Sequence, residues 1–267
     1  MEAGLKERFL ERWAKYFPGA ELPLALWYAD APGEAEPAGD SLSPRGEGIA
    51  APAGQRCFVG DLVRARRGTP LAFAAESVGC AGGRRYLGFS GELRPGFEYF
   101  LSCGIPGKME GERYKKSPEL VRELLKHSPR FPAPGKYLLA KRWDRLAPAD
   151  APEVVVFFAP PDVLAGLFTL AGFEEAEPAG AVFAPFAAGC GTLVLYPFLE
   201  ARAAKPRCVL GLFDVSARPY IEPERLSFAV PHVRFARMVA NMDESFLITG
   251  SWEKVRRRIA RAAAPTT

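Results

Sequence analysis

The chain has 267 residues, of which 48% are hydrophobic and 25% charged, and its 35 basic and 31 acidic residues give a net charge of +4. These values are typical of a globular protein long enough to bury a core, as one large domain or two ordinary ones. No apolar run approaches the roughly 18 residues of a membrane span, and residues 1–7 lack the apolar segment of a signal peptide. We therefore expect a cytoplasmic protein without a transmembrane helix.

The first segment, residues 1–20, is predicted to be an amphipathic helix that ends at Pro18-Gly19. Its apolar residues share one face at helical spacing: Leu5, Phe9, Leu10, Trp13 and Phe17. A strand is predicted over residues 22–28. Residues 30–55 are rich in Pro, Gly, Ala and Glu without periodicity, so they are predicted to be a surface insertion, either a lid or a loop.

The next part of the chain, residues 21–147, is predicted to be a first α+β half. Apolar runs and turn residues alternate along it, and Ser117-Pro118 is a favourable helix start. The expected elements are a helix over 62–67, strands over 71–75, 85–89 and 97–103, a helix from 117, and a strand over 137–140.

A second half is predicted over residues 152–260, with a similar order of elements. The expected elements are strands over 153–159 and 181–186, a helix from 162, a strand from Cys190 to 198, a strand over 208–213, a helix over 231–239, and a strand over 245–249.

The two halves are expected to be an internal duplication, because a Cys-Gly turn recurs at Cys80 and at Cys190. The first turn precedes Trp143 by 63 positions, and the second precedes Trp252 by 62. Each half then has the β-α-β-β-α-β order of ferredoxin-like folds. The predicted fold is therefore α+β, with two such halves forming a pseudo-dimer behind the N-terminal helix, and the two Cys turns could meet at the junction.

The five cysteines contain no CxxC pair and no zinc-type spacing. Thiolates are ligands for iron–sulfur clusters, zinc and copper(I). Ligands of a shared metal centre must lie in turns or at the ends of elements, and four cysteines are expected in such places: Cys57, Cys80, Cys103 and Cys190. These four are predicted as metal ligands. The alternative is that they are small buried packing residues, which is the role expected of Cys208.

Two loops, residues 104–116 and 214–221, are the other candidates for a binding site. Lys108 and Arg218 within them are predicted to bind a carboxylate or phosphate, or to balance thiolate charge. The alternative is that Arg218 pairs with Asp214 or Glu222 and braces its loop. No sequence pattern of a catalytic nucleophile or a nucleotide-binding loop occurs, so no catalytic residue or reaction is predicted.

The most basic stretch is the tail, where Arg256, Arg257, Arg258 and Arg261 crowd the end of a predicted helix. We expect a solvated helix face there rather than a nucleic-acid site, because no aromatic side chains are interleaved with the arginines.

Four segments, residues 80–89, 100–114, 216–231 and 241–258, resemble the domain of unknown function 169 family, also called ArCR. The resemblance extends from about Leu22 to Arg258. It implies no activity, but it implies that a Cys near position 57 and the Cys-Gly-Gly turn at Cys80 are shared within the family. The family's occurrence in archaea and anaerobic bacteria favours an iron–sulfur cluster.

The leading hypothesis is a cytoplasmic protein whose cysteines hold an iron–sulfur cluster or another thiophilic metal between the halves, for redox or sensing with a redox partner. The alternative is a metal-free module that binds a small anionic metabolite in the same cleft. A third hypothesis is an interaction protein that engages a partner through its basic C-terminal helix.

Overall fold

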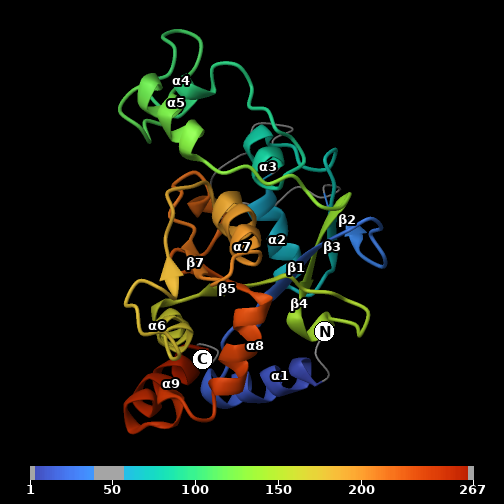
Figure 1. Ribbon diagram of the computed structural model, residues 1–267, viewed down its shortest axis with the longest axis vertical. Helices are drawn as coiled ribbons and strands as arrows, with labels where there is room; N and C mark the ends of the chain where they lie inside the picture. Colours follow the sequence, from blue (N-terminus) through green and yellow to red (C-terminus); the bar gives the residue numbers. More distant parts are fainter. Residues whose placement is uncertain (1–3, 39–56, 264–267) are drawn as a thin grey trace.

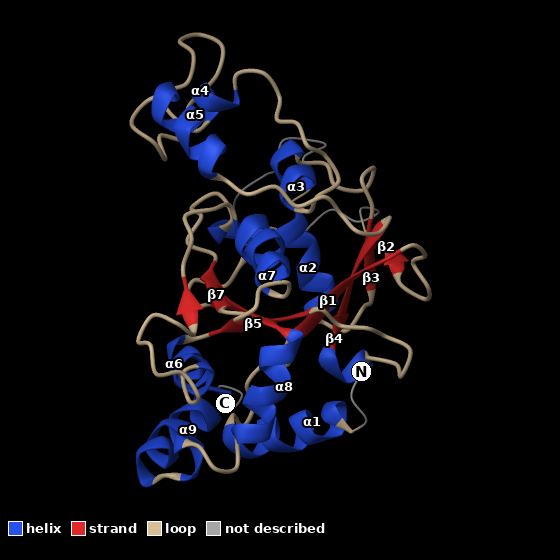
Figure 2. Cartoon of the chain, viewed as in Figure 1, coloured by secondary structure: helices blue, strands red, loops and turns tan. Residues whose placement is uncertain are grey.

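One mixed β-sheet runs through the molecule (Figures 1 and 2). The computed structural model describes residues 4–38 and 57–263, and within these ranges the sheet has eight strands in the order β2-β3-β4-β1-β5-β8-β7-β6. The strands are β1 (Leu24–Ala29), β2 (Glu36–Pro37), β3 (Leu71–Phe73), β4 (Tyr137–Arg142), β5 (Val154–Ala159), β6 (Val182–Phe183), β7 (Cys208–Gly211) and β8 (Leu226–Pro231). The mixed α+β class is confirmed.

Helices cover both faces of the sheet (Figure 2). One face packs against α2 (Phe58–Arg66), the π-helical turn η2 (Gly191–Leu195) and α7 (Tyr196–Glu200). The other packs against α1 (Leu5–Tyr16), α6 (Pro161–Ala171) and α8 (His232–Asn241), with α9 (Gly250–Ala263) outside them. Because β5 is central and buried on both faces, its sequence is the continuous apolar run VVVFFA.

The connection from β3 to β4 extends beyond α2 to one end of the molecule (Figure 1). It carries α3 (Ala81–Tyr86), α4 (Phe97–Phe100) and α5 (Pro118–His127). We call residues 97–127 the outer lobe. Ser117 caps α5 as predicted, since its Oγ accepts a hydrogen bond of 3.3 Å from the Leu120 N–H.

Four segments predicted as strands are helical. Residues 85–89 belong to α3 and the turn after it, and residues 97–103 belong to α4 and the turn after it. The run after Cys190 forms η2 and α7. Residues 245–249 contain the 3₁₀ turn η4 (Phe246–Ile248). Short apolar runs do not distinguish a strand from a buried helical turn, and local capping decides between them. In α3 the Cys80 Sγ accepts from the Gly83 N–H at 3.5 Å.

The predicted β-α-β-β-α-β order of each half is therefore wrong. The described elements run β1-β2-α2-β3-α3-α4-α5-β4 in the first half and β5-α6-β6-η2-α7-β7-η3-β8 in the second, where η3 is Arg218–Tyr220. The matched tryptophans are also not equivalent, because Trp143 opens the turn η1 (Trp143–Arg145) after β4 whereas Trp252 lies in α9. The predicted insertion at 30–55 includes β2, and its residues 39–55 lie outside the described residues.

The two halves of the sheet nevertheless share one strand order and one pairing register. Ala140 in β4 pairs with Leu26 and Leu71, and Ala229 in β8 pairs with Val156 and Val209 in the same way. The halves join where β1 and β5 run antiparallel, with Ala25 opposite Val155 at the centre of the pairing. The division into residues 21–147 and 152–260 stays a prediction.

Within the described residues, no helix is long and apolar enough to cross a bilayer. Three arginines of α9 are engaged within the chain, because Arg256 and Arg257 pair with Glu253 at 2.7 and 2.9 Å and Arg258 pairs with Asp162.

Asp243 joins α1 to the end of α8. Its carboxylate accepts hydrogen bonds from Tyr16 Oη at 2.7 Å, Lys15 Nζ at 3.0 Å and Arg12 Nε at 2.6 Å. These bonds, that of Tyr16 foremost, lower the pKa of Asp243 from 3.8 to about 2. The resulting stability is fully present above the unfolded-state pKa and is lost as the pH falls through the folded-state pKa.

We therefore expect Asp243→Asn to destabilise the protein at neutral pH by about 1 kcal/mol or less, since the carboxylate is partly exposed and its ion pairs are screened by solvent. Urea unfolding at pH 7 and at pH 2 should show this difference shrinking as the wild-type Asp243 becomes protonated. A difference that stays constant between these two pH values would contradict the assignment.

Candidate thiol site

Three of the five cysteines stand immediately before a helix. Cys57 precedes α2, Cys80 precedes α3 and Cys190 precedes η2, so all three follow turns between elements. A Cβ atom placed on Gly83 would lie 3.5 Å from Cys80 Cβ and 3.9 Å from Cys190 Sγ. Cys57 interacts electrostatically with both other thiols. The structure thus brings these three predicted ligands together, on the face of the sheet covered by α2 and α7.

The environment of Cys57 and Cys190 favours the protonated form of both thiols. Cys190 is buried, and burial raises its pKa well above the usual 9.0, with further increases from the negative charges of Cys57, Cys80 and Asp214. Burial also raises the pKa of Cys57, which hydrogen bonds from the N–H groups of Gly60 and Val59 partly offset. A thiol that is protonated at neutral pH is a poor nucleophile, whereas a nearby metal cation would deprotonate it.

Tyr86 and Asp214 complete the surroundings. The Tyr86 ring packs 3.3 Å from the position of a Cβ on Gly191, and its pKa is raised to about 12, mainly by burial and then by Cys190. Asp214 Oδ2 accepts a hydrogen bond of 3.1 Å from the Gly189 N–H. Gly189 is tightly enclosed, because a Cβ there would lie 3.1 Å from Val59 and 3.0 Å from Leu212. The start of α2 and the turn after β7 therefore meet at the Cys190 turn.

Among the described residues, no three His, Cys, Asp or Glu side chains are already arranged to coordinate a single ion. Metal binding at this site therefore requires the side chains of Cys57, Cys80 and Cys190 to rotate toward a common point. Gly83 lies beside the last two, and the site is closely packed there, because a Cβ on Gly83 would also lie 3.0 Å from Val78 Cγ1.

Residues 21–241 match the model of the domain of unknown function 169 family, described as uncharacterised ArCR. The chain belongs to this family. This confirms the resemblance seen in the sequence, and the matched range contains the whole sheet and all three clustered cysteines. No curated protein and no solved structure matches the chain.

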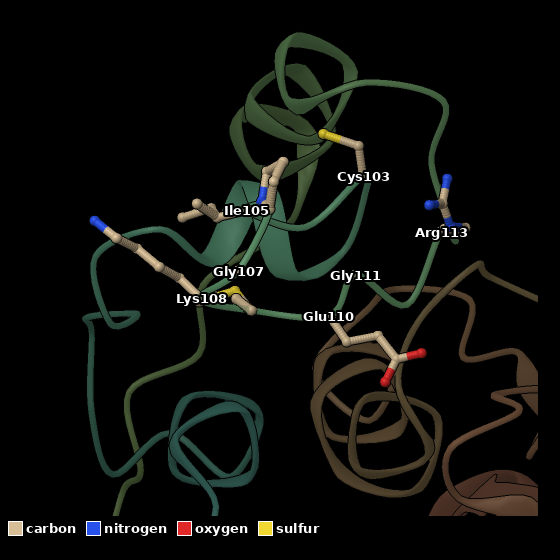
Figure 3. Close-up of a pocket in the computed structure, with 9 residues that line it drawn as sticks. Cys103, Ile105, Gly107, Lys108, Glu110, Gly111 and Arg113 are labelled. Atoms are coloured by element: carbon tan, nitrogen blue, oxygen red, sulfur yellow. The ribbon is translucent and has the colours of Figure 1, made fainter.

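The outer lobe also lies within the family match, and it holds the predicted ligands Cys103 and Lys108. They line an open hollow of about 480 Å³ formed by residues 103–113. In Figure 3 the side chains of Cys103, Lys108, Glu110 and Arg113 point in different directions, so they do not converge on a ligand. The lobe is separated from α3 (Figure 1), so the structure does not bring Cys103 to the other three cysteines.

Arg218 braces its own loop. Its guanidinium group donates to the backbone carbonyls of Arg225, of Pro223 at 2.5 Å and of Glu222 at 3.3 Å. This is the structural role considered for it from the sequence, although the acceptors are carbonyl groups instead of carboxylates. Cys208 is fully buried in β7, as expected for a packing residue.

Sequence reasoning missed the proximity of Asp214 and Tyr86 to the cysteines. Asp214 was named as a partner for Arg218 and within the segment 212–214, where the resemblance implied a further Cys turn in other members of the family, and Tyr86 was placed in a strand. Asp214 lies three residues after the end of the apolar strand β7, and Cys80 lies seven residues after Phe73, the end of the apolar strand β3. This shared position after an apolar run is the signal that could have pointed to Asp214.

Proposed function

We propose that this protein binds a thiophilic metal ion or an iron–sulfur cluster through Cys57, Cys80 and Cys190, and that it serves redox chemistry or sensing in the cytoplasm. The observation that supports this most directly is that Cys80 and Cys190, from two separate connections, lie beside Gly83, and that Cys57, from a third connection, interacts electrostatically with both. Thiolates bind soft and borderline metals, and ligands drawn from element ends can adjust to a shared ion.

The position of the thiols before helices adds to this proposal. The Gly83 N–H points at Cys80 Sγ, and such a group stabilises the thiolate that a metal requires. Simple packing explains buried Cys190 but not exposed Cys80. Nucleophilic catalysis is less favoured, because burial and neighbouring negative charges raise the pKa values of Cys57 and Cys190.

We also propose that the chain is an internal duplication in which Cys57 is equivalent to Cys190. The shared strand register supports this, since α2 connects β2 to β3 just as η2 and α7 connect β6 to β7. An Ala-Arg pair also stands at the end of α2 and directly after α7, and in both places a Pro follows four residues after the Arg, at Arg66 and Pro70 and at Arg202 and Pro206. The metal would then lie near the axis that relates the halves.

The metal-free alternative, an anion-binding module, is supported only by the hollow in the outer lobe, where Lys108 and Arg113 supply positive charge. Arg218 contributes less than the sequence suggested, because its guanidinium group is engaged with backbone carbonyls.

The test is the metal content of protein purified without oxygen, measured by elemental analysis and by visible absorption from sulfur-to-iron charge transfer. We expect Cys80→Ser to reduce metal occupancy by about tenfold or more. Cys103→Ser is the matched control, since Cys103 is also exposed but lies in the outer lobe, and it should retain the metal.

Full occupancy in Cys80→Ser, or loss of metal from Cys103→Ser alone, would refute the proposed ligand set. Wild-type protein without metal that also fails to bind added Zn²⁺ or Fe²⁺ would refute the metal function and direct attention to the outer-lobe hollow.

A further inference from the structure

The connections after β6 and after β7 leave three large apolar side chains exposed to solvent. Phe186 is 55% exposed, Phe213 is 54% exposed and Val215 is 67% exposed. The two connections lie side by side, because the Asp214 carboxylate accepts a hydrogen bond of 3.1 Å from the Gly189 N–H. Single exposed apolar residues are ordinary on a protein surface, whereas three of them on two adjoining connections mark a candidate contact surface.

A basic segment of the outer lobe borders these apolar side chains. Lys115 Nζ lies 3.7 Å from the centroid of the Phe186 ring. Residues 108–116 contain four basic and two acidic side chains. Within the described residues, Arg113, Lys115 and Lys116 form no ion pair, since the ion pairs of the outer lobe involve other basic residues. The positive charge of this segment is therefore not neutralised by a carboxylate of the described chain.

The backbone is strained where both segments begin. Among the described residues, Arg113 and Leu212 alone combine a side chain with a positive φ, at 55° and 64°. Arg113 begins the basic segment, and Leu212 directly precedes Phe213. Each strained residue is held by a hydrogen bond, from the Arg113 N–H to the Ser102 carbonyl at 3.0 Å and from the Leu212 N–H to Thr192 Oγ1 at 3.3 Å. Such conformations cost about 1 kcal/mol or more and concentrate at binding sites.

We infer that these two segments form a docking surface for an acidic protein. We call this surface the loop face, and its residues are Arg113, Lys115, Lys116, Phe186, Phe213 and Val215. Protein interfaces combine an apolar centre with a charged rim, and complementary charge selects the partner. The apolar side chains of the loop face and its unpaired basic residues therefore fit a partner that presents carboxylates around an apolar side chain.

A nucleic acid fits the loop face less well than an acidic protein. Single-stranded nucleic acids bind by stacking their bases on open aromatic faces, and Lys115 already covers one face of the Phe186 ring. Glu110 and Glu112 interrupt the basic segment and would repel phosphate groups. The inference goes beyond the proposed function and does not depend on it, because docking at the loop face requires no metal.

The probe is a fluorescein-labelled peptide in which pairs of Glu flank single Leu and Phe residues. Its binding to the reduced full-length protein is followed by fluorescence anisotropy at low ionic strength in the presence of a chelator. We expect saturable binding that weakens about tenfold or more in Phe213→Ser and in Lys116→Glu. The same peptide with Lys in place of Glu should not bind.

Two variants on the other side of the sheet are matched controls. Phe168→Ser removes a half-exposed Phe from α6, and Lys254→Glu reverses an exposed charge on α9. Both should bind the peptide with the affinity of the wild type. Near-ultraviolet circular dichroism of each variant establishes that the tertiary fold is intact before the titration.

Four outcomes would overturn the inference. They are the absence of saturable binding to the wild type, unchanged affinity in Phe213→Ser, equal weakening in the control variants, and tighter binding of a labelled oligouridylate than of the acidic peptide. Since the chelator removes metal throughout, each of these outcomes leaves the proposed metal function standing.

Discussion

Replacing Trp143 with alanine should lower the free energy of unfolding by about 3–5 kcal/mol. The Trp143 side chain is fully buried beneath the sheet, with its ring centroid 4.6 Å from that of Phe235 and 5.6 Å from that of Phe9. These contacts join the end of β4 to α1 and α8. Truncation would therefore remove apolar contacts with these two helices and leave a cavity that closely packed aromatic rings cannot fill.

Guanidinium unfolding of wild type and Trp143→Ala at neutral pH measures this effect. Phe168→Ala is the control, because Phe168 on α6 exposes about half of its surface (50%), and its truncation should cost less than about 1 kcal/mol. Equal losses for both variants would show that the cluster around Trp143 does not carry the expected share of the stability.

Replacing Glu21 with alanine should lower the free energy of unfolding by about 3 kcal/mol, because it removes a carboxylate that neutralises buried charge. Glu21 accepts from Arg66 Nε at 2.6 Å and from Arg225 Nη1 at 2.7 Å. The Arg66 side chain is only 6% exposed and retains just one other carboxylate, that of Glu222, at 3.0 Å. A buried guanidinium group that has lost a partner costs far more than a broken surface pair.

The control is Glu253→Ala, which removes two ion pairs on the exposed surface of α9 and should change the unfolding midpoint little. Thermal and urea unfolding of the two variants should therefore differ clearly. A Glu21→Ala variant as stable as Glu253→Ala would mean that solvent reaches Arg66 as readily as it reaches the arginines of α9.

Long periodic segments were predicted correctly. The apolar stripe of residues 5–17 forms α1, the apolar run of β5 is the central strand, and Ser117-Pro118 starts α5. In these segments the local pattern and the tertiary environment agree. The errors fall on runs of five to nine residues, such as 85–89 and 245–249, where burial is equally compatible with a strand and with a helical turn.

The repeat was also inferred partly from the wrong residues. Pairing Cys80 with Cys190 and Trp143 with Trp252 relied on spacing, which insertions such as the outer lobe change without affecting the sheet. The strand register instead aligns Ala140 with Ala229, and under the proposed duplication Cys57 corresponds to Cys190. Hydrogen-bonded pairing is a property of two strands together, so it is not visible along a single stretch of sequence.

The sequence by itself determined the mixed α+β class, the family, the N-terminal helix and the four cysteines worth considering. Only the tertiary structure decided which of them meet, because the contacts among Cys57, Cys80 and Cys190 join residues up to 133 positions apart in the chain. It also separated Cys103 onto the outer lobe and brought Asp214 beside the Cys190 turn. Side chains from distant connections come together only when the sheet fixes the order and direction of its strands.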